Sequence, residues 1–102
     1  MENEFTRTEL LIGSEGLNRL RKASVMVLGI GGVGSHCIEA LARSGVGKLI
    51  LVDHDRVSVS NINRQSIAMQ STVGQYKTRV MKAKIKDISP QTEVVTYECF
   101  VL

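Results

Sequence analysis

Three short apolar runs along the chain predict three β-strands. Residues 24–28 and 49–52 are continuous apolar runs rather than alternating ones, which is typical of strands buried on both faces of a parallel sheet. Residues 93–97 predict a third, weaker strand. Between these runs, apolar residues recur at helical spacing in three segments, which are residues 10–22, 35–44 and 77–88.

The three predicted helices differ in how clearly their faces and ends are marked. Gly13 and Gly16 interrupt the first segment, so we expect a short turn and then a helix from about Ser14, a plausible N-cap. The second helix should end at Gly45, and the third before Pro90. The predicted apolar face of the second helix is Val33, Cys37, Ala40, Leu41 and Ser44. The predicted apolar stripe of the third is Val80, Met81, Ile85 and Ile88.

The order of these elements predicts an α/β fold. Residues 24–53 form a strand–helix–strand unit of about 30 residues, the length expected of a βαβ unit, and a right-handed crossover makes its two strands parallel. We expect a Rossmann-like, mostly parallel sheet with flanking helices. With three strands and an open edge, this sheet is incomplete.

Composition narrows the class of protein. The chain has 102 residues, 43% of them apolar, and a formal net charge of +3, which fits one small globular domain and phosphate-bearing ligands. No apolar run approaches membrane-spanning length. Cys37 and Cys99 lie far apart without a CxxC motif, so we expect a reducing, cytoplasmic location and no metal site within these residues.

A glycine-rich loop follows the first predicted strand and opens the second helix. Gly29, Gly31 and Gly34 match G-x-G-x-x-G, in which successive glycines permit a tight turn, close approach to a phosphate, and close packing of helix on strand. Gly32 widens the space for backbone contact, and Asp53 ends the next strand, where its carboxylate can bind a ribose. Taken alone, the motif favours NAD and leaves the choice between a dinucleotide and a mononucleotide open.

The segment after Asp53 is unusually long and polar. Residues 55–75 are mostly irregular, with a possible short helix over 65–69, and they follow the carboxyl end of a strand, where ligands bind in such sheets. Arg64 and Lys77 can reach phosphate oxygens. Two cations near a nucleotide favour a triphosphate, whose leaving pyrophosphate needs charge support. The alternative is a solvated loop with surface cations.

Four motifs in order give the chain a family resemblance. They are Gly29–Gly34, Asp53-x-Asp55, Ser60–Gln65 and Thr72–Lys77. Together they resemble the ThiF/MoeB/HesA superfamily, the relatives of ubiquitin-activating enzyme, over residues 5–101. Within the superfamily the chain is most similar to the branch that acts on N6-threonylcarbamoyladenosine in tRNA. Tyr76 departs from the pattern, because the family usually has proline there, and we expect a looser turn.

The resemblance implies ATP-dependent adenylation of a carboxyl group. It implies nucleotide binding by Gly29, Gly31, Gly32, Gly34, Asp53, Asp55, Asn61, Arg64, Gln65 and Lys77. It also implies catalytic roles for Arg64 and Lys77, and for Arg7 reaching into the site of a homodimer partner. The family's Mg²⁺ ligand and any catalytic cysteine would lie beyond Leu102. We therefore expect residues 1–102 to be the N-terminal portion of a ThiF-type domain, inactive alone.

Several functional alternatives remain open. The activated carboxyl group could belong to tRNA or to the C-terminus of a ubiquitin-like sulfur carrier. A dehydrogenase NAD domain or a non-catalytic nucleotide-binding scaffold would share the glycine loop. The basic residues of the last helix, Arg79, Lys82, Lys84 and Lys86, could contact tRNA phosphates or form a solvated face.

Overall fold

Three parallel strands form the sheet of this computed structural model, which describes residues 3–100. Strands β1 (Ser24–Leu28), β2 (Lys48–Val52) and β3 (Glu93–Tyr97) lie in the order β1-β2-β3. Val25 pairs with Leu49, and Leu49 with Val94. The predicted strands and their parallel direction are confirmed.

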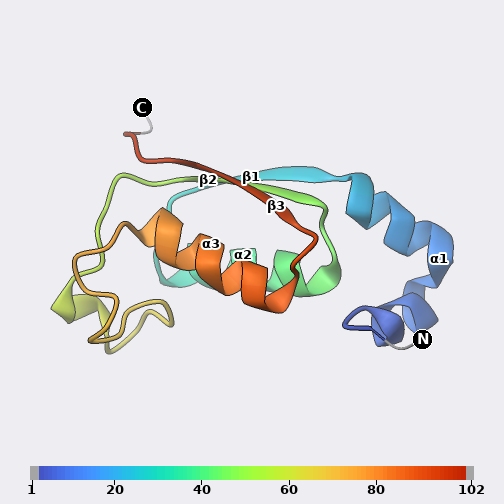
Figure 1. The fold of residues 1–102 in the computed structure, drawn as a ribbon, viewed down its shortest axis with the longest axis horizontal. Helices are drawn as coiled ribbons and strands as arrows, with labels where there is room; N and C mark the ends of the chain where they lie inside the picture. Colours follow the sequence, from blue (N-terminus) through green and yellow to red (C-terminus); the bar gives the residue numbers. More distant parts are fainter. Residues whose placement is uncertain (1–2, 101–102) are drawn as a thin grey trace.

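Both crossover helices cover the same face of the sheet. Helices α2 (Gly32–Ser44) and α3 (Lys77–Ile88) lie side by side beneath the strands (Figure 1). This follows because two right-handed crossovers that advance across the sheet in one direction place their helices on one side. On the opposite face Met26, Leu28 and Tyr97 are each more than half exposed. This face of the sheet is therefore uncovered, and the expectation that β1 is buried on both faces is wrong.

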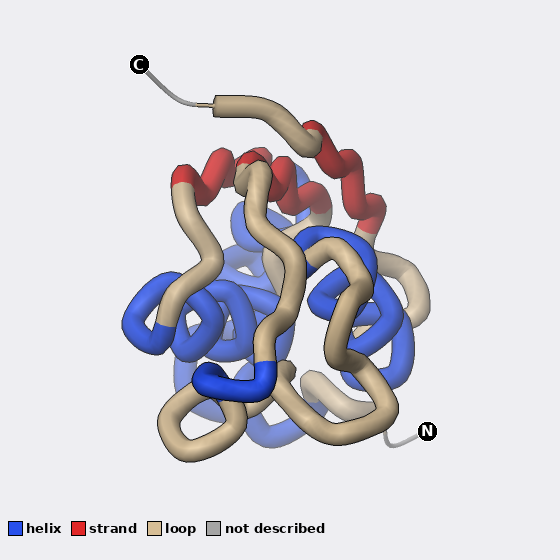
Figure 2. The backbone as a smooth tube through the Cα atoms, turned by 90° about the vertical axis from the view of Figure 1, so that its left-hand side faces the viewer, coloured by secondary structure: helices blue, strands red, loops and turns tan. Residues whose placement is uncertain are grey.

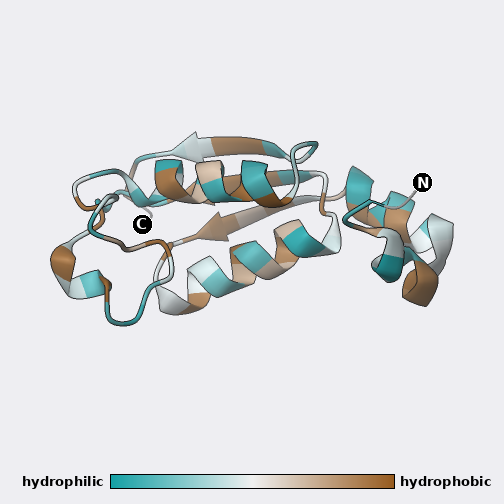
Figure 3. Ribbon diagram, turned by 60° about the horizontal axis from the view of Figure 1, so that its bottom comes forward, coloured by the Kyte–Doolittle hydropathy of each residue, from teal (hydrophilic) through white to brown (hydrophobic). Residues whose placement is uncertain are grey.

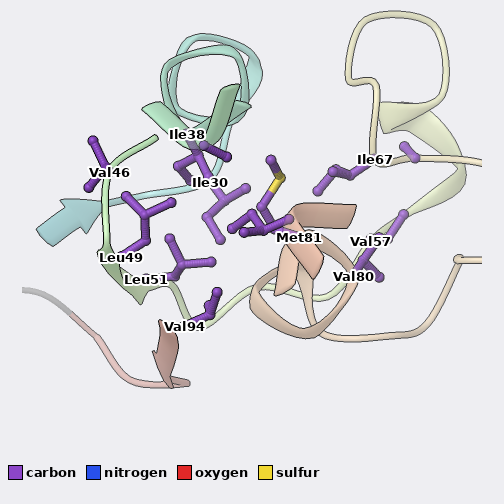
Figure 4. Close-up of a cluster of buried hydrophobic side chains, with 13 residues drawn as sticks. Ile30, Ile38, Val46, Leu49, Leu51, Val57, Ile67, Val80, Met81 and Val94 are labelled. Atoms are coloured by element: carbon purple, nitrogen blue, oxygen red, sulfur yellow. The ribbon is translucent and has the colours of Figure 1, made fainter. Parts of the chain in front are cut away.

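The core fills the layer between sheet and helices. Ile38 of α2, Leu49 and Leu51 of β2, and Met81 and Ile85 of α3 are fully buried. Figure 4 shows the side chains of Ile38, Leu49, Leu51 and Met81 converging, with Val57 and Ile67 extending the cluster toward the loop after β2. Figure 3 shows hydrophobic and hydrophilic residues alternating along both helices, the pattern of helices with one buried face. The predicted stripe of α3 is confirmed.

The predicted buried face of α2 is wrong. The helix begins at Gly32, three residues before the predicted start, and its buried residues are Ser35, Ile38 and Ala42. Val33 is 86% exposed, and Cys37 is exposed as well. The cause is Gly34: a Cβ atom there would lie 2.2 Å from the carbonyl oxygen of Gly29. Because glycine lacks this atom, α2 can pack with Gly34 against the end of β1. Val33, the neighbouring residue, then points outward.

Helix α1 (Thr6–Lys22) lies beyond the end at which the strands begin (Figure 1). The chain is helical from Thr6, where a turn before Ser14 was expected, so that part of the prediction is wrong. The predicted interruption is confirmed at Gly13, whose φ of 78° and ψ of 168° break the helical path, but not at Gly16. Among the described residues, no helix is long and apolar enough to span a membrane.

The segment between β2 and α3 is folded onto the core. It contains a single 3₁₀ turn, η1 (Val59–Asn61), and the possible helix over 65–69 is absent, replaced by turns. Val57, Ile67 and Ala68 are nevertheless buried with the core cluster. The few apolar residues of this polar segment therefore anchor it under the carboxyl end of the sheet.

Candidate nucleotide-binding site

The sequence-predicted site residues gather mainly at one end of the sheet. Figure 2 looks onto this end, where the loops that follow the three strands come together. The glycine loop follows β1, and Asp53 directly follows β2. Adjacent parallel strands bring these two segments side by side, at the edge of the sheet where α/β proteins bind ligands.

Asp53 ties the glycine loop to the end of β2. Its side chain is nearly buried, at 8% exposure. One carboxylate oxygen accepts a hydrogen bond from the backbone N–H of Ile30 at 2.5 Å, and the other accepts from the N–H of Asp55 at 2.7 Å. Each oxygen has a second lone pair. Asp53 can therefore shape the loop and still accept a hydrogen bond from a hydroxyl group.

The glycine loop leaves room and backbone donors for an anion. Gly29 has φ 92°, a conformation that favours glycine. Gly31 precedes α2 as its N-cap without any side-chain cap, and a Cβ atom on it would meet nothing within 4 Å. The first N–H groups of α2 have no partner within the helix, and they sit at the positive end of its dipole. This geometry suits a phosphate.

Lys77 supplies a buried positive charge beside the loop. It is 6% exposed, and its Nζ lies 4.0 Å from an Asp55 carboxylate oxygen. The other Asp55 oxygen lies 3.0 Å from His54 Nε2. A buried ammonium group needs close compensation by negative charge, and one carboxylate at 4.0 Å provides little. An additional anion at this position would complete the charge balance.

Asn61 and Gln65 are buried in the segment between β2 and α3. Asn61 Oδ1 accepts a hydrogen bond from the N–H of Ser58 at 3.0 Å, which fixes η1. Gln65 Oε1 is the one buried side-chain atom without a hydrogen-bond partner among the described residues. Buried polar atoms are normally paired, so this oxygen fits a ligand or water donor.

Neither of the two predicted catalytic arginines, Arg64 and Arg7, contacts the site through its side chain. Arg64 is exposed, and its guanidinium donates hydrogen bonds to the Ser60 carbonyl at 2.8 Å and to Asn63 Oδ1 at 3.1 Å. Its backbone carbonyl oxygen would lie 3.8 Å from a Cβ atom on Gly32, so its main chain, but not its guanidinium group, adjoins the glycine loop. Arg7 lies on α1, at the other end of the sheet (Figure 1).

The structure adds a pair of residues that sequence reasoning missed. The rings of His54 and Phe100 stack with centroids 4.0 Å apart. They line a hollow of about 280 Å³ at the ends of the three strands, together with Gly29 and Asp53. The two rings are far apart in the sequence, and only the strand order brings them together. An aromatic wall beside a glycine loop suits a flat base.

The described residues offer little to a magnesium ion. Asp53, His54 and Asp55 place one potential ligand atom each within 4.8 Å of one another. Magnesium prefers oxygen ligands in octahedral geometry, and both Asp53 oxygens already accept backbone hydrogen bonds. The Asp55 oxygens likewise face His54 at 3.0 Å and Lys77 at 4.0 Å, so these described residues alone do not make a complete ligand set for the ion. The prediction of a further ligand beyond Leu102 stays a prediction.

This arrangement coincides with a family match. Residues 5–101 match the ThiF family, and the chain belongs to that family. It is 55% identical over 100 residues to the tRNA threonylcarbamoyladenosine dehydratase of Bacillus subtilis, covering 98% of this chain and 39% of that protein. It is 38% identical over 86 residues to the sulfur carrier protein adenylyltransferase of Thermus thermophilus, covering 84% and 32%.

Solved structures give the same result. The structure of the Escherichia coli tRNA N6-threonylcarbamoyladenosine dehydratase in complex with ATP superposes with a TM-score of 0.93 at 43% identity, covering 96% of this chain and 40% of that one. The chain thus spans about two fifths of the length of the dehydratases it matches. The Rossmann-like fold and the family resemblance are confirmed.

Proposed function

We propose that the full-length protein adenylates a carboxyl group with ATP, and that residues 1–102 are the N-terminal portion of its nucleotide-binding domain. The observation that carries the proposal is the connected path from the glycine loop through Asp53 and Asp55 to the buried Lys77. The similarity to adenylyltransferases and to an ATP-bound dehydratase supports it. Two cations favour the three phosphates of ATP, whose leaving pyrophosphate needs charge support, over the two phosphates of NAD, so a dehydrogenase is disfavoured.

In the proposed reaction the substrate carboxylate attacks the α-phosphorus of ATP. A bond forms between the carboxylate oxygen and phosphorus, the bond to the bridging oxygen breaks, and pyrophosphate leaves. The N–H groups after Gly31 bind phosphate oxygens, Asp53 accepts a hydrogen bond from the ribose, and Asn61 and Gln65 line the wall. Lys77 and Arg64 stabilise the charge that develops on the leaving oxygens. Bound Mg²⁺ would neutralise further phosphate charge, with Asp55 helping to hold it.

The proposed substrate carboxyl is that of N6-threonylcarbamoyladenosine in tRNA, which then cyclises as AMP leaves. Three dehydratases at 43–55% identity support this substrate. The second candidate is the C-terminus of a ubiquitin-like sulfur carrier, supported by the adenylyltransferase at 38% identity. A tRNA substrate also favours a cytoplasmic location.

We further propose a homodimer in which Arg7 completes the partner's site. Arg7 and the glycine loop lie at opposite ends of strands of five residues, each about 17 Å long at ~3.3 Å per residue. Arg7 therefore cannot serve its own site. A twofold axis across the long direction of the molecule would place each α1 beside the partner's glycine loop.

Pyrophosphate exchange into ATP by the full-length protein tests the adenylation step. We expect exchange with tRNA that carries threonylcarbamoyladenosine and none with tRNA lacking it. Arg64→Ala should abolish exchange, whereas Arg19→Ala, an exposed arginine on α1, should not alter it. Exchange that requires a sulfur-carrier C-terminus would favour the second candidate, and unchanged exchange by Arg64→Ala would remove its phosphate role.

Mixing two inactive variants tests the shared site. Arg7→Ala and Lys77→Ala should each lose exchange, and a mixture that forms heterodimers should regain part of it, because one site then has both residues. A mixture as inactive as its components, in which heterodimers are shown to form, would contradict the contribution of Arg7 across the interface.

A further inference from the structure

Two exposed arginines, Arg56 and Arg79, contact the ring of Tyr76 next to the candidate site. The guanidinium carbon of Arg56 lies 4.1 Å from the Tyr76 ring centroid, and that of Arg79 lies 5.3 Å from it. Both distances are within the range of cation–π attraction. We call these three residues the arginine–tyrosine patch. With Gly74 and Gln75 they line a hollow of about 280 Å³.

Backbone hydrogen bonds hold the patch in place. Arg56 and Tyr76 form an isolated antiparallel bridge. On either side of it the N–H of Val57 donates to Gln75 O at 2.8 Å, and the N–H of Lys77 donates to Asp55 O at 3.1 Å. The Arg56 guanidinium donates to Gly74 O at 2.8 Å. The patch is thus preorganised without a ligand, which lowers the entropic cost of binding one.

The patch keeps positive charge available for a partner. Arg56 is exposed and has no ion pair within residues 3–100. Arg79 is 70% exposed and pairs through Nε with Glu98 at 3.2 Å, which leaves its two terminal NH₂ groups for other acceptors. By contrast, Lys84 of the same helix is bound to Glu39 and Ser66. Beside Tyr76, at the start of α3, the terminal NH₂ groups of Arg79 therefore remain available, and further along the helix Lys82 and Lys86 also have no ion pair within the described residues.

The patch adjoins the nucleotide-binding residues directly. Tyr76 precedes Lys77, and Arg56 follows Asp55, so the two segments that carry the patch also carry the Asp55–Lys77 pair. A molecule held at the patch would be next to the candidate site without occupying it. A substrate that brings its carboxyl group to the site would have its neighbouring groups at such a position.

We propose that the arginine–tyrosine patch binds single-stranded RNA next to the reacting nucleotide, an inference that rests on the proposed tRNA substrate. An unstacked base can lie against an aromatic or guanidinium plane, and arginines bind the adjoining phosphates. A positively charged, aromatic, rigid surface beside the site matches this chemistry. A protein C-terminus would have no base to stack there and no phosphates for the two arginines.

The backbone conformation of Tyr76 allows its ring to be removed without changing the local backbone path. Its φ of −63° and ψ of 133° are values that proline adopts, and the described hydrogen bonds of the bridge use the N–H groups of Val57 and Lys77 rather than that of Tyr76. Tyr76→Pro therefore removes the ring and keeps the local path. The tyrosine takes a proline-like conformation, and the expectation of a looser turn at this position stays a prediction.

The experiment measures binding of tRNA carrying threonylcarbamoyladenosine to the full-length protein by fluorescence anisotropy at several salt concentrations. We expect Tyr76→Pro to weaken binding about tenfold, as loss of one stacked base does, while Tyr76→Phe binds normally. Arg56→Gln should reduce the slope of log affinity against log salt by about 0.7. ATP affinity should be unchanged in all three, and Arg19→Gln is the matched control.

Two outcomes would overturn the proposal, and they are distinguishable. If the unsubstituted protein binds this tRNA and Tyr76→Pro and Arg56→Gln bind it equally well, the patch is not an RNA contact. If the unsubstituted protein binds no tRNA, the proposed substrate itself is wrong, and the patch proposal fails with it. Unchanged ATP affinity throughout separates either result from damage to the nucleotide site.

Discussion

Gly34 and Gly31, both near the start of α2, differ in their structural roles. Gly34 allows α2 to approach β1, because a Cβ atom on it would lie 2.2 Å from Gly29 O. Gly31 has φ −97°, open to other residues, and a Cβ atom there would meet no atom of the described protein within 4 Å. Packing therefore explains Gly34 and leaves Gly31 without a structural requirement, as expected of a position that faces a ligand.

This difference yields a paired prediction. Gly34→Ala should lower the free energy of unfolding by about 1–3 kcal/mol or more, since the added methyl group forces helix and strand apart. Gly31→Ala should change it by less than about 1 kcal/mol and still weaken ATP binding, because the methyl group occupies the space of a phosphate. Urea denaturation and ATP titration measure the two effects. Normal ATP affinity in Gly31→Ala would contradict the assigned phosphate position.

Residue-scale features also mark the limit of prediction from sequence. The glycine spacing, Asp53 and Lys77 were recognisable because each belongs to a motif of known spacing. The outward direction of Val33 and Cys37 was not, because both are apolar and lie at helical spacing. The close contact of Gly34 with Gly29 sets the rotation of α2, and the third glycine of the motif was the signal that could have revealed it.

At the scale of elements, the carboxylate of Glu39 links helices α2 and α3. Glu39 on α2 contacts Lys84 of α3 at 3.0 Å and Arg43 of its own helix at 3.1 Å. The hydrogen bond from Lys84 lowers the pKa of Glu39 below its ordinary value, burial opposes this shift, and Arg43 adds to the lowering. Because the folded-state pKa is depressed, the ionised form stabilises the fold.

A pH dependence of stability follows from this sign. The contribution of Glu39 should be complete above its unfolded pKa of about 4.3 and should disappear as the pH falls through the lower folded value. Glu39→Gln should cost about 0.5–1 kcal/mol at neutral pH, as for partly exposed ion pairs, and nothing at strongly acid pH. Urea denaturation across this range measures it.

The control for this effect is Glu15→Gln. Its ion pair with Arg19 lies within α1, and both side chains are at least 80% exposed. It should cost less than Glu39→Gln at neutral pH. If the difference in unfolding free energy between Glu39→Gln and the unsubstituted protein grows toward acid pH, the stabilising role assigned to the Glu39–Lys84 ion pair is contradicted.

Helices and strands could be predicted where the local apolar pattern matched the spacing of the neighbouring elements. Continuous apolar runs identified β1 and β2, and the strand–helix–strand spacing gave their parallel pairing. The segment after β2 was harder, since its polar composition indicated an exposed loop. Its sparse apolar residues, Val57 and Ile67, are buried, and their partners lie on other elements. Local sequence does not contain that information.

At the scale of the whole molecule, the two ends of the sheet carry different proposed roles. The strands end at the glycine loop, Asp53 and the His54–Phe100 stack, and they begin beside α1, which carries Arg7 (Figure 1). The chain spans about two fifths of the length of the dehydratases it matches. The described residues include those that we propose to bind the base, ribose and phosphates of one nucleotide, with the arginine–tyrosine patch beside them.

The most direct test of the central claim is calorimetric titration of the full-length protein with Mg-ATP and, separately, with NAD. The account predicts saturable heat with ATP and none with NAD, and loss of the ATP signal in Lys77→Ala, since the buried ammonium group needs a phosphate beside it. Saturable heat with NAD and none with ATP would contradict the account and make this end of the sheet a dinucleotide site.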